Sequence, residues 1–371
     1  MSDLDVSFTE RDWLFAFVGG IIIGIATSLN FALMGRITGF SGIFNTLIKF
    51  DIKGGLRWKF CFITGLIYTG FLLYYLGDDG IVKFKGISLL GIDRIGIQMF
   101  DSRDAKIEGL SLYGWIVSGL LVGIGTKAGN GCTSGHGVCG IPRFSPRSLV
   151  AVMTFMATCA FTATYRKNSP FWDEEYTFTS EFDDSYRWAL VLVANGLLIS
   201  FFVIYLITLV IDKETMLPLI ETPVSIIIGG IFAFGLCLSG MTRRTKVYNF
   251  FTISSDWDPS LGFVMGGAIL VNVITFTYVI KHRGRPFFVR KLGPLANGFP
   301  DLKLFFGAAV FGIGWGICGL CPGPAMLNSI HLTHCLIWLP AVGAGQLFWE
   351  GLEKFYSSIF GKAPRTKQKR D

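Results

Sequence analysis

Long apolar stretches alternate with short polar segments along the whole chain. Each stretch is close to the length with which a helix crosses a bilayer, about 20 residues. The pattern predicts nine transmembrane helices, at 13–34, 57–76, 111–129, 146–165, 187–211, 223–239, 261–280, 303–319 and 332–349. A polar residue before a proline supports three of these starts, at Ser145-Pro146, Asp258-Pro259 and Glu221-Thr222-Pro223. We therefore expect an all-α integral membrane protein that forms one transport domain.

The composition agrees with this expectation. Of the 371 residues, 51% are hydrophobic and only 16% are charged, whereas soluble domains carry about 25% charged residues. The net charge of +7 comes from short loops and the basic tail 350–371, where cytoplasmic segments collect lysine and arginine. No nucleic-acid motif accompanies it, so the expected partner is membrane lipid. The acidic N-terminus lacks the basic region of a cleavable signal.

Loop charges predict the orientation. Loops 49–59 and 281–303 are strongly basic, which favours an external N-terminus and a cytoplasmic C-terminus. Arg243 and Arg244 fall outside under this assignment, and we expect them to be interfacial anchors.

Glycine-rich breaks recur four times, as GRITGFSG at 35–42, GNGCTSGHGVCG at 129–140, GLCLSGM at 235–241 and GICGLCPGPA at 316–325. Two breaks fall in a first half, 13–165, and two in a second half, 223–349, with 187–211 as a linking helix. Because each half crosses four times and one crossing separates them, the halves should be pseudo-symmetric inverted repeats, as in many secondary transporters.

The breaks themselves indicate re-entrant half-helices. Irregular backbone survives at membrane depth only inside the protein or beside a cavity, and a helix that restarts there directs its amides at an anion. Close helix packing is the alternative explanation for such glycines. It accounts poorly for GNGCTSGHGVCG, which also carries polar residues.

Cysteines in the breaks give the predicted site its chemistry. Cys132 and Cys321 occupy equivalent points of two breaks, and a thiol is a weak donor and a polarizable acceptor that suits a terminal sulfur atom. The full set of candidate substrate-binding residues is Cys132, Cys321, His136, Ser134, Lys127, Cys237, Cys318 and Ser41.

Metal, redox and catalytic signals are weak. Cys132, His136 and Cys139 lack the fourth ligand of a structural zinc site, and Cys318-Gly-Leu-Cys321 has no βαβ context for a redox motif. The eight cysteines do not suggest a secreted disulfide framework. No recognised catalytic motif is present. We expect no metal, no cofactor and no enzymatic activity.

Three segments resemble the YeeE/YedE family of sulfur-compound transporters: GCTSGHGVCGIPRFSPRSLVA, GLCLSGMTRRTKVYNFF with DWDPSLGFVMGGA, and GLCPGPAM. The resemblance implies a pseudo-symmetric helical permease of the plasma membrane with half-helices and a narrow path along which cysteines contact thiosulfate. Cys132 and Cys321 match two of those cysteines. The first break departs from the pattern, because it offers Thr38 and Ser41 but no thiol.

Other functions remain open from the sequence. The chain could be a membrane sulfur-transfer enzyme that works through cysteine persulfides, or a non-transporting subunit of a membrane complex. A cytoplasmic sulfurtransferase is a further partner that the resemblance leaves open, and the sequence does not define the coupling ion or the oligomeric state.

Overall fold

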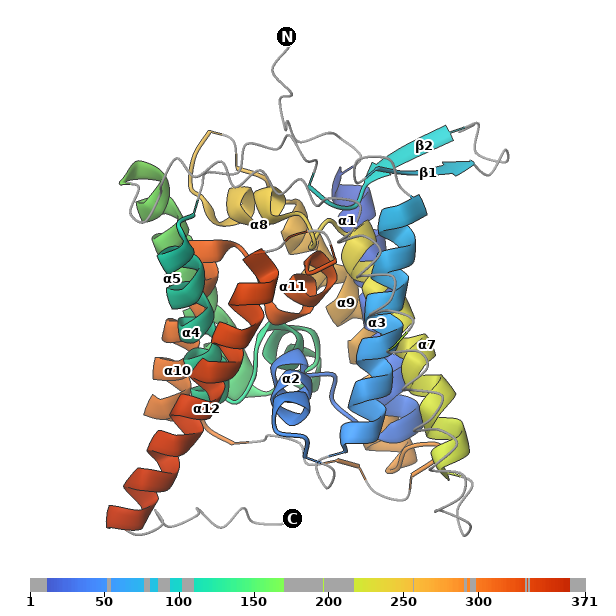
Figure 1. The fold of residues 1–371 in the computed structure, drawn as a ribbon. Helices are drawn as coiled ribbons and strands as arrows, with labels where there is room; N and C mark the ends of the chain where they lie inside the picture. Colours follow the sequence, from blue (N-terminus) through green and yellow to red (C-terminus); the bar gives the residue numbers. More distant parts are fainter. Residues whose placement is uncertain are drawn as a thin grey trace.

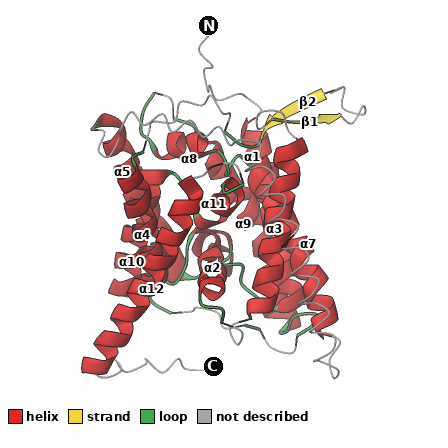
Figure 2. Cartoon of the chain, viewed as in Figure 1, coloured by secondary structure: helices red, strands yellow, loops and turns green. Residues whose placement is uncertain are grey.

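The structure is a computed structural model of the chain. It describes residues 12–51, 55–76, 81–85, 94–101, 110–169, 196 and 217–360, less 256, 290–291, 294–297, 331 and 333. The predicted span 187–211, apart from residue 196, and the tail from 361 lie outside the described residues. The described part is almost entirely helical, with one antiparallel pair of strands, β1 (Ile81–Lys85) and β2 (Arg94–Gln98), at one end (Figure 2).

The described helices follow a repeated order, in which a long helix, a break with a short helix and a second long helix occur four times (Figure 1). The first group is α1 (Asp12–Met34), α2 (Phe40–Ile48) and α3 (Leu56–Leu76). The second is α4 (Leu112–Ala128), a π-helical segment (Thr133–Val138), a 3-10 turn (Ile141–Arg143) and α5 (Pro146–Asn168). The third is α7 (Leu217–Leu238), α8 (Arg244–Phe251) and α9 (Ser260–Thr277), which runs on as a π-helical turn (Tyr278–Arg283). The fourth is α10 (Leu302–Cys318), α11 (Pro322–Asn328) and α12 (His334–Phe360).

Six of the described helical stretches are long and apolar enough to cross a membrane, namely Asp12–Met34, Leu56–Tyr75, Pro146–Asn168, Ile220–Leu238, Ser260–Arg283 and Leu302–Asn328. The spans predicted at 111–129 and 332–349 are the helices α4 and α12, which are not among these six. The protein is therefore a multi-pass helical membrane protein.

One predicted start is wrong. Helix α7 begins at Leu217 and carries Pro223 inside it, so the run Glu221-Thr222-Pro223 does not open the helix. Glu221 has another role, because its carboxylate pairs with both Arg36 and Arg57. At Ser145 the prediction is confirmed, since its hydroxyl accepts a hydrogen bond from the Ser148 N–H.

The first long helix of every group is followed, within two residues of its last residue, by a residue in the left-handed conformation. These residues are Gly35 (φ 67°), Asn130 (φ 58°), Gly240 (φ 74°) and Gly319 (φ 71°). Glycine and asparagine adopt this conformation with little strain and commonly end helices. The breaks predicted from glycine content therefore begin where the backbone requires these residue types.

The packing of the long helices has an internal two-fold pattern. Helix α1 packs on α9 and on α7, and α3 packs on α7. Helix α4 packs on α10 and on α12, and α5 packs on α10. Exchanging α1 with α7, α3 with α9, α4 with α10 and α5 with α12 reproduces the same set of contacts.

Helices α1 and α7 run in opposite directions. A Cβ atom on Gly19, near the start of α1, would lie 2.6 Å from the Ser239 backbone nitrogen just after α7. At the other end, Arg36 just after α1 pairs with Glu221 near the start of α7. In Figure 1 the short helix α8 accordingly lies toward the top, whereas α2 lies in the lower half.

Candidate functional site

Cys132 and Cys321 line the same small cavity, whose volume is about 150 Å³. Cys132 precedes the π-helical segment and Cys321 precedes α11. Both side chains are buried. The Thr133 hydroxyl lies 3.2 Å from the Cys321 Sγ, and the Ser134 hydroxyl lies 3.3 Å from the Cys132 Sγ. The two breaks therefore meet at their cysteines, a contact between segments about half a chain apart.

The lining of this narrow cavity is apolar and rich in sulfur. Besides the two thiols it includes the side chains of Met156, Met241 and Met265, and it includes the aromatic rings of Phe40, Phe232, Phe250, Phe251 and Trp315. None of the described residues that line it is charged. Any species inside it can meet hydroxyl and thiol groups, but no fixed ionic side chain.

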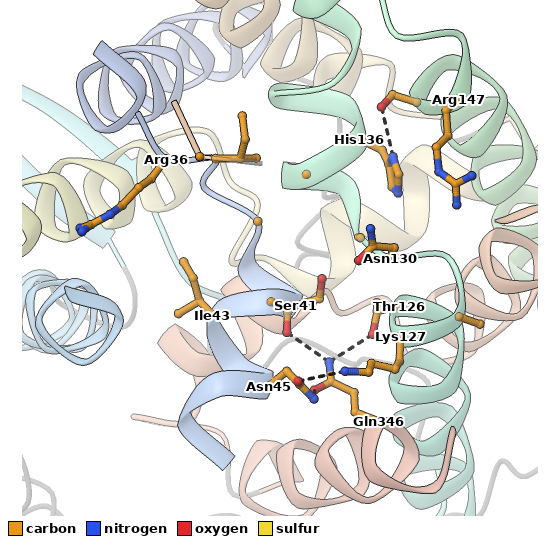
Figure 3. A pocket seen from close by; sticks show the side chains of 18 of the residues that line it. Arg36, Ser41, Ile43, Asn45, Thr126, Lys127, Asn130, His136, Arg147 and Gln346 are labelled. Atoms are coloured by element: carbon orange, nitrogen blue, oxygen red, sulfur yellow. Dashed lines mark hydrogen bonds between the residues drawn. The ribbon is translucent and has the colours of Figure 1, made fainter. Parts of the chain in front are cut away.

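A much wider cavity, of about 800 Å³, lies on the other side of the breaks. It is strongly polar and basic: its lining includes Arg36, Lys59, Lys127, Arg143, Arg147 and Lys303, against the acids Asp301 and Glu353. Figure 3 shows part of this cavity, with side chains from α2, α4 and α12 directed toward one another. A cavity lined mainly by one sign of charge raises the local concentration of the opposite ion.

Two short backbone segments separate the cavities. Gly39 and Gly135 line the wide cavity, whereas their neighbours Phe40 and Ser134 line the narrow one. The Phe40 N–H donates to the Ser134 hydroxyl over 3.0 Å and holds the two segments together. In each segment, two adjacent residues therefore line different cavities, so a single stretch of backbone separates the cavities there.

His136 organises the second break. Its Nε2 lies 3.1 Å from the Gly129 carbonyl oxygen, which can only accept, so Nε2 carries the proton. Its Nδ1 lies 3.2 Å from the Ser148 hydroxyl, which then donates to it. Both ring nitrogens are therefore occupied by the protein. This arrangement fits a role in holding the loop, while a direct contact with substrate would require it to open.

Lys127 lines the wide cavity, but its charge is compensated. Its Nζ lies 3.1 Å from a Glu350 carboxylate oxygen and donates to the Asn45 Oδ1 over 3.1 Å. Glu350 also accepts from Lys49 over 2.7 Å. The hydrogen bonds from Lys49 above all, with those from Lys127 and Lys354, lower the pKa of Glu350 from 4.5 to about 2.

Ser41 lies beside this network. The Ser41 carbonyl accepts from the Gln346 Nε2 over 3.3 Å, and the same nitrogen donates to the Thr126 hydroxyl over 3.3 Å (Figure 3). These bonds join α2 to α4 and α12 at the edge of the wide cavity.

Cys237 and Cys318 lie on neither cavity. Both are fully buried. The Cys318 Sγ is 3.4 Å from the Gly314 carbonyl and accepts from the Leu320 N–H over 3.3 Å. The structure thus sets these two apart from Cys132 and Cys321, which share a cavity.

Arg243 and Arg244 are not interfacial anchors, so that prediction is wrong. Their side chains are only 9% and 6% exposed. The Arg244 Nε donates to the Cys318 carbonyl over 2.6 Å, and the Arg166 Nη1 donates to the Ile317 carbonyl over 2.7 Å. Helix α10 ends with orphan carbonyls that need donors, which explains why Arg244 and Arg166 are buried.

Several residues that line the cavities could not be identified from the sequence. Met156, Met265 and Trp315 lie in ordinary apolar helix positions, and nothing in their spacing distinguishes them from core. Arg147 follows shortly after the second break, so its position is the signal that could have identified it, whereas Arg143 beside the same break is a candidate from the sequence. Among the described residues, no group of three His, Cys, Asp or Glu side chains is arranged to hold a metal ion.

Comparisons with known proteins give the family. Residues 220–359 match the model of a family of unknown function, DUF6691. A probable transporter of Xylella fastidiosa, strain Temecula1, is 33% identical over 157 residues, which are 42% of this chain and 95% of that relative. A second probable transporter of the same strain is 36% identical over 126 residues, 33% of this chain and 84% of the relative. A probable transporter of strain 9a5c is also 36% identical, over 86% of its length. Since these relatives are matched over most of their length, the chain belongs to the family of membrane transporters that they represent.

Proposed function

We propose that this transporter is a permease for a small sulfur-containing anion, with thiosulfate as the first candidate. The observation that carries the proposal is the meeting of Cys132 and Cys321 on one narrow, uncharged cavity beside a wide basic one. Thiosulfate has an oxyanion end and a soft terminal sulfur atom. The basic wide cavity suits the oxyanion end, and the narrow cavity with its two thiols suits the terminal sulfur atom.

The division of chemistry between the cavities favours passage over tight binding. The basic wide cavity attracts an anion from water. Removing the anion from water costs free energy, and thiol and hydroxyl groups in the narrow cavity replace part of its hydration through weak hydrogen bonds. Because none of the described residues that line the narrow cavity is a cation, an anion there is not held by an ion pair with them and can move on.

The helix arrangement supports two inverted halves. The exchange of packing partners and the opposite directions of α1 and α7 are what a pseudo-two-fold axis in the membrane plane would produce. The 157 residues matched in one relative are 95% of that protein but 42% of this chain, so the relative is less than half as long. Related proteins of half the length fit a chain built from two halves. On this model the four breaks are re-entrant segments.

The orientation predicted from loop charges assigns the wide cavity to the cytoplasmic side. Lys59 and Lys303, which line it, belong to or adjoin the basic loops at 49–59 and 281–303. The substrate would then pass the narrow cavity before the wide one during uptake. The proposed location is the plasma membrane.

Uptake measured in cells that lack their own sulfate and thiosulfate transport tests the proposal. Cells that produce the chain should accumulate labelled thiosulfate and grow on it. Cys132→Ala and Cys321→Ala should reduce uptake to background, because each removes a sulfur contact from the narrow cavity. Cys61→Ala is the matched control, since Cys61 is buried on α3 and lines neither cavity.

Two outcomes would contradict the proposal. If the wild-type protein is inserted in the membrane but no sulfur anion is taken up, the chain is not such a permease. If uptake occurs but both cavity cysteines can be replaced without effect, the path does not depend on them. A persulfide on Cys132 or Cys321 after exposure to substrate, visible as a mass increase, would instead support sulfur-transfer chemistry.

A further inference from the structure

Most cations on the wide cavity already form ion pairs with acids. Arg36 pairs with Glu221, Lys303 pairs with Glu353, and Arg147 lies 3.1 Å from Asp301. Lys127 shares Glu350 with Lys49.

Lys59 is satisfied differently. Its Nζ donates to the Thr46 hydroxyl over 2.6 Å, and the charge of Asp51 acts on it. These contacts hold the wall of the cavity together and occupy the side chains concerned, although basic side chains still outnumber acidic ones in the lining.

Arg143 differs from the other lining cations. No carboxylate is paired with it among the described residues, and its one hydrogen bond runs from Nε to the Cys139 carbonyl, over 2.8 Å. Its Nη1 is buried without any partner. Arg36 also has an unpartnered Nη1, but its charge is already compensated by Glu221.

The backbone fixes the Arg143 guanidinium in place. Arg143 is the last residue of the 3-10 turn Ile141–Arg143, which contains Pro142, and Phe144 after it is left-handed, with φ 55°. Nε is held by Cys139 and Nη1 is buried without a partner, so a ligand would meet the guanidinium at Nη2 and complete the Nη1–Nη2 edge. A guanidinium edge matches two oxygens of a carboxylate, phosphate or sulfonate group. A buried charged donor without a partner costs free energy, and a bound oxyanion would remove that cost.

We propose that Arg143 is the centre of a second anion-binding site, in the wide cavity, that takes the oxyanion end of a tetrahedral ligand such as thiosulfate or sulfate. This site rests on the proposed function for its role in transport, but it can be tested by binding alone. It recognises oxygen atoms, whereas the cysteines in the neighbouring cavity contact sulfur. Oxygen-free hydrosulfide should therefore not compete for it.

Binding to the purified full-length protein tests the site. Thiosulfate and sulfate are titrated in turn, by calorimetry or by the fluorescence of Trp58, which lines the same cavity. Arg143→Gln should weaken the binding of both anions about ten-fold or more, because it removes a charge-assisted contact. Arg143→Lys should recover only part of the affinity, since an ammonium group lacks the paired edge.

Lys303→Gln is the matched control. It removes the same unit of charge from the same cavity, but Lys303 is already paired with Glu353, so binding should change by less than about three-fold. Equal losses in Arg143→Gln and Lys303→Gln would overturn the proposal in favour of a general field. Unchanged affinity in Arg143→Gln would also overturn it. If Arg143→Gln does not fold, the comparison of Arg143→Lys with wild type decides, and unchanged affinity there has the same meaning.

The proposed anion site and the proposed transport function can be refuted independently of each other. Cys132→Ala should keep the binding while losing uptake. Binding that depends on Arg143 in a protein without any sulfur-anion uptake would retain the site and reject the proposed function. Uptake together with binding that ignores Arg143 would retain the function and reject the site.

Discussion

The two cavities lie back to back and differ in almost every property. The wide one measures about 800 Å³ and is lined by six basic side chains. The narrow one measures about 150 Å³, and none of the described residues in its lining is charged. A single site cannot both attract an anion strongly and release it quickly, because an anion held by several cations leaves slowly. On the proposed function, this difference assigns attraction of the anion to the wide cavity and its passage to the narrow one.

The boundary between these compartments depends on very few atoms. Phe40 and Ser134 face the narrow cavity, and Gly39 and Gly135 face the wide one. A small change on either side should therefore have unequal effects on uptake. The following predictions use this inequality.

A negative charge should be far more damaging in the narrow cavity than in the wide one. Thr133→Asp places a carboxylate beside the Cys321 thiol, whose sulfur lies 3.2 Å from the Thr133 hydroxyl, in a setting of low dielectric. Uptake should fall about 100-fold or to background, because the charge repels an anion there with little screening.

Neutral and distant variants are the controls for this effect. Thr133→Asn has the same size without the charge and should keep most of the uptake. Asn45→Asp adds a charge to the lining of the wide cavity, where Lys127 already donates to the side-chain oxygen. Its uptake should stay within about three-fold of wild type. Equal losses in both aspartate variants would show that the two cavities do not differ in the way proposed.

A larger side chain in the segments that separate the two cavities should slow the passage of the anion without weakening its attraction to the wide cavity. A Cβ on Gly135 would meet the nearest heavy atom, the Gly39 Cα, at 3.8 Å, so Gly135→Ala should behave like wild type. Gly135→Val adds two methyl groups beyond the single Cβ of the alanine variant. It should lower the maximal uptake rate about ten-fold with little change in KM. Gly266→Val serves as the control, because nothing lies within 4 Å of that Cβ position. A raised KM with an unchanged maximal rate would place the constriction elsewhere.

Local features of the fold and of the candidate site can be predicted from the sequence. Apolar stretches mark the long helices, and left-handed glycines such as Gly240 and Gly319 mark their ends. The two cysteines that share a cavity stand in equivalent motifs, which is why the sequence alone could select them. Both properties depend on residues near one another along the chain.

Features that depend on distant partners could not be read in the same way. Lys127 looked like an available cation because Glu350, which compensates it, lies more than two hundred residues away. Arg244 looked like an interfacial anchor because the carbonyl it caps, that of Cys318, belongs to another group of helices. Pairing of charges is decided by which helices pack together, and the periodicity of a single segment contains no information about that.

The smallest expected effect concerns the ion pairs that hold the wide cavity. Glu350→Gln removes the carboxylate shared by Lys49 and Lys127. Surface-accessible ion pairs contribute little individually, so the melting temperature should fall by only a few degrees and the KM for thiosulfate should change by less than about three-fold. Lys303→Gln, which breaks a single pair on the same cavity, is the control and should have a still smaller effect.

The pH dependence of this effect follows from the lowered pKa of Glu350. A carboxyl whose folded pKa is about 2, below its unfolded value near 4.3, stabilises the folded state fully above the unfolded value. That contribution disappears as the pH falls from the unfolded value through the folded one. The difference in melting temperature between wild type and Glu350→Gln should therefore be constant from about pH 6 to pH 8 and should shrink below about pH 4. A difference that changes between pH 6 and pH 8 would mean that another group titrates with Glu350, and that the network of Lys49 and Lys127 is not the one that holds this side of the cavity.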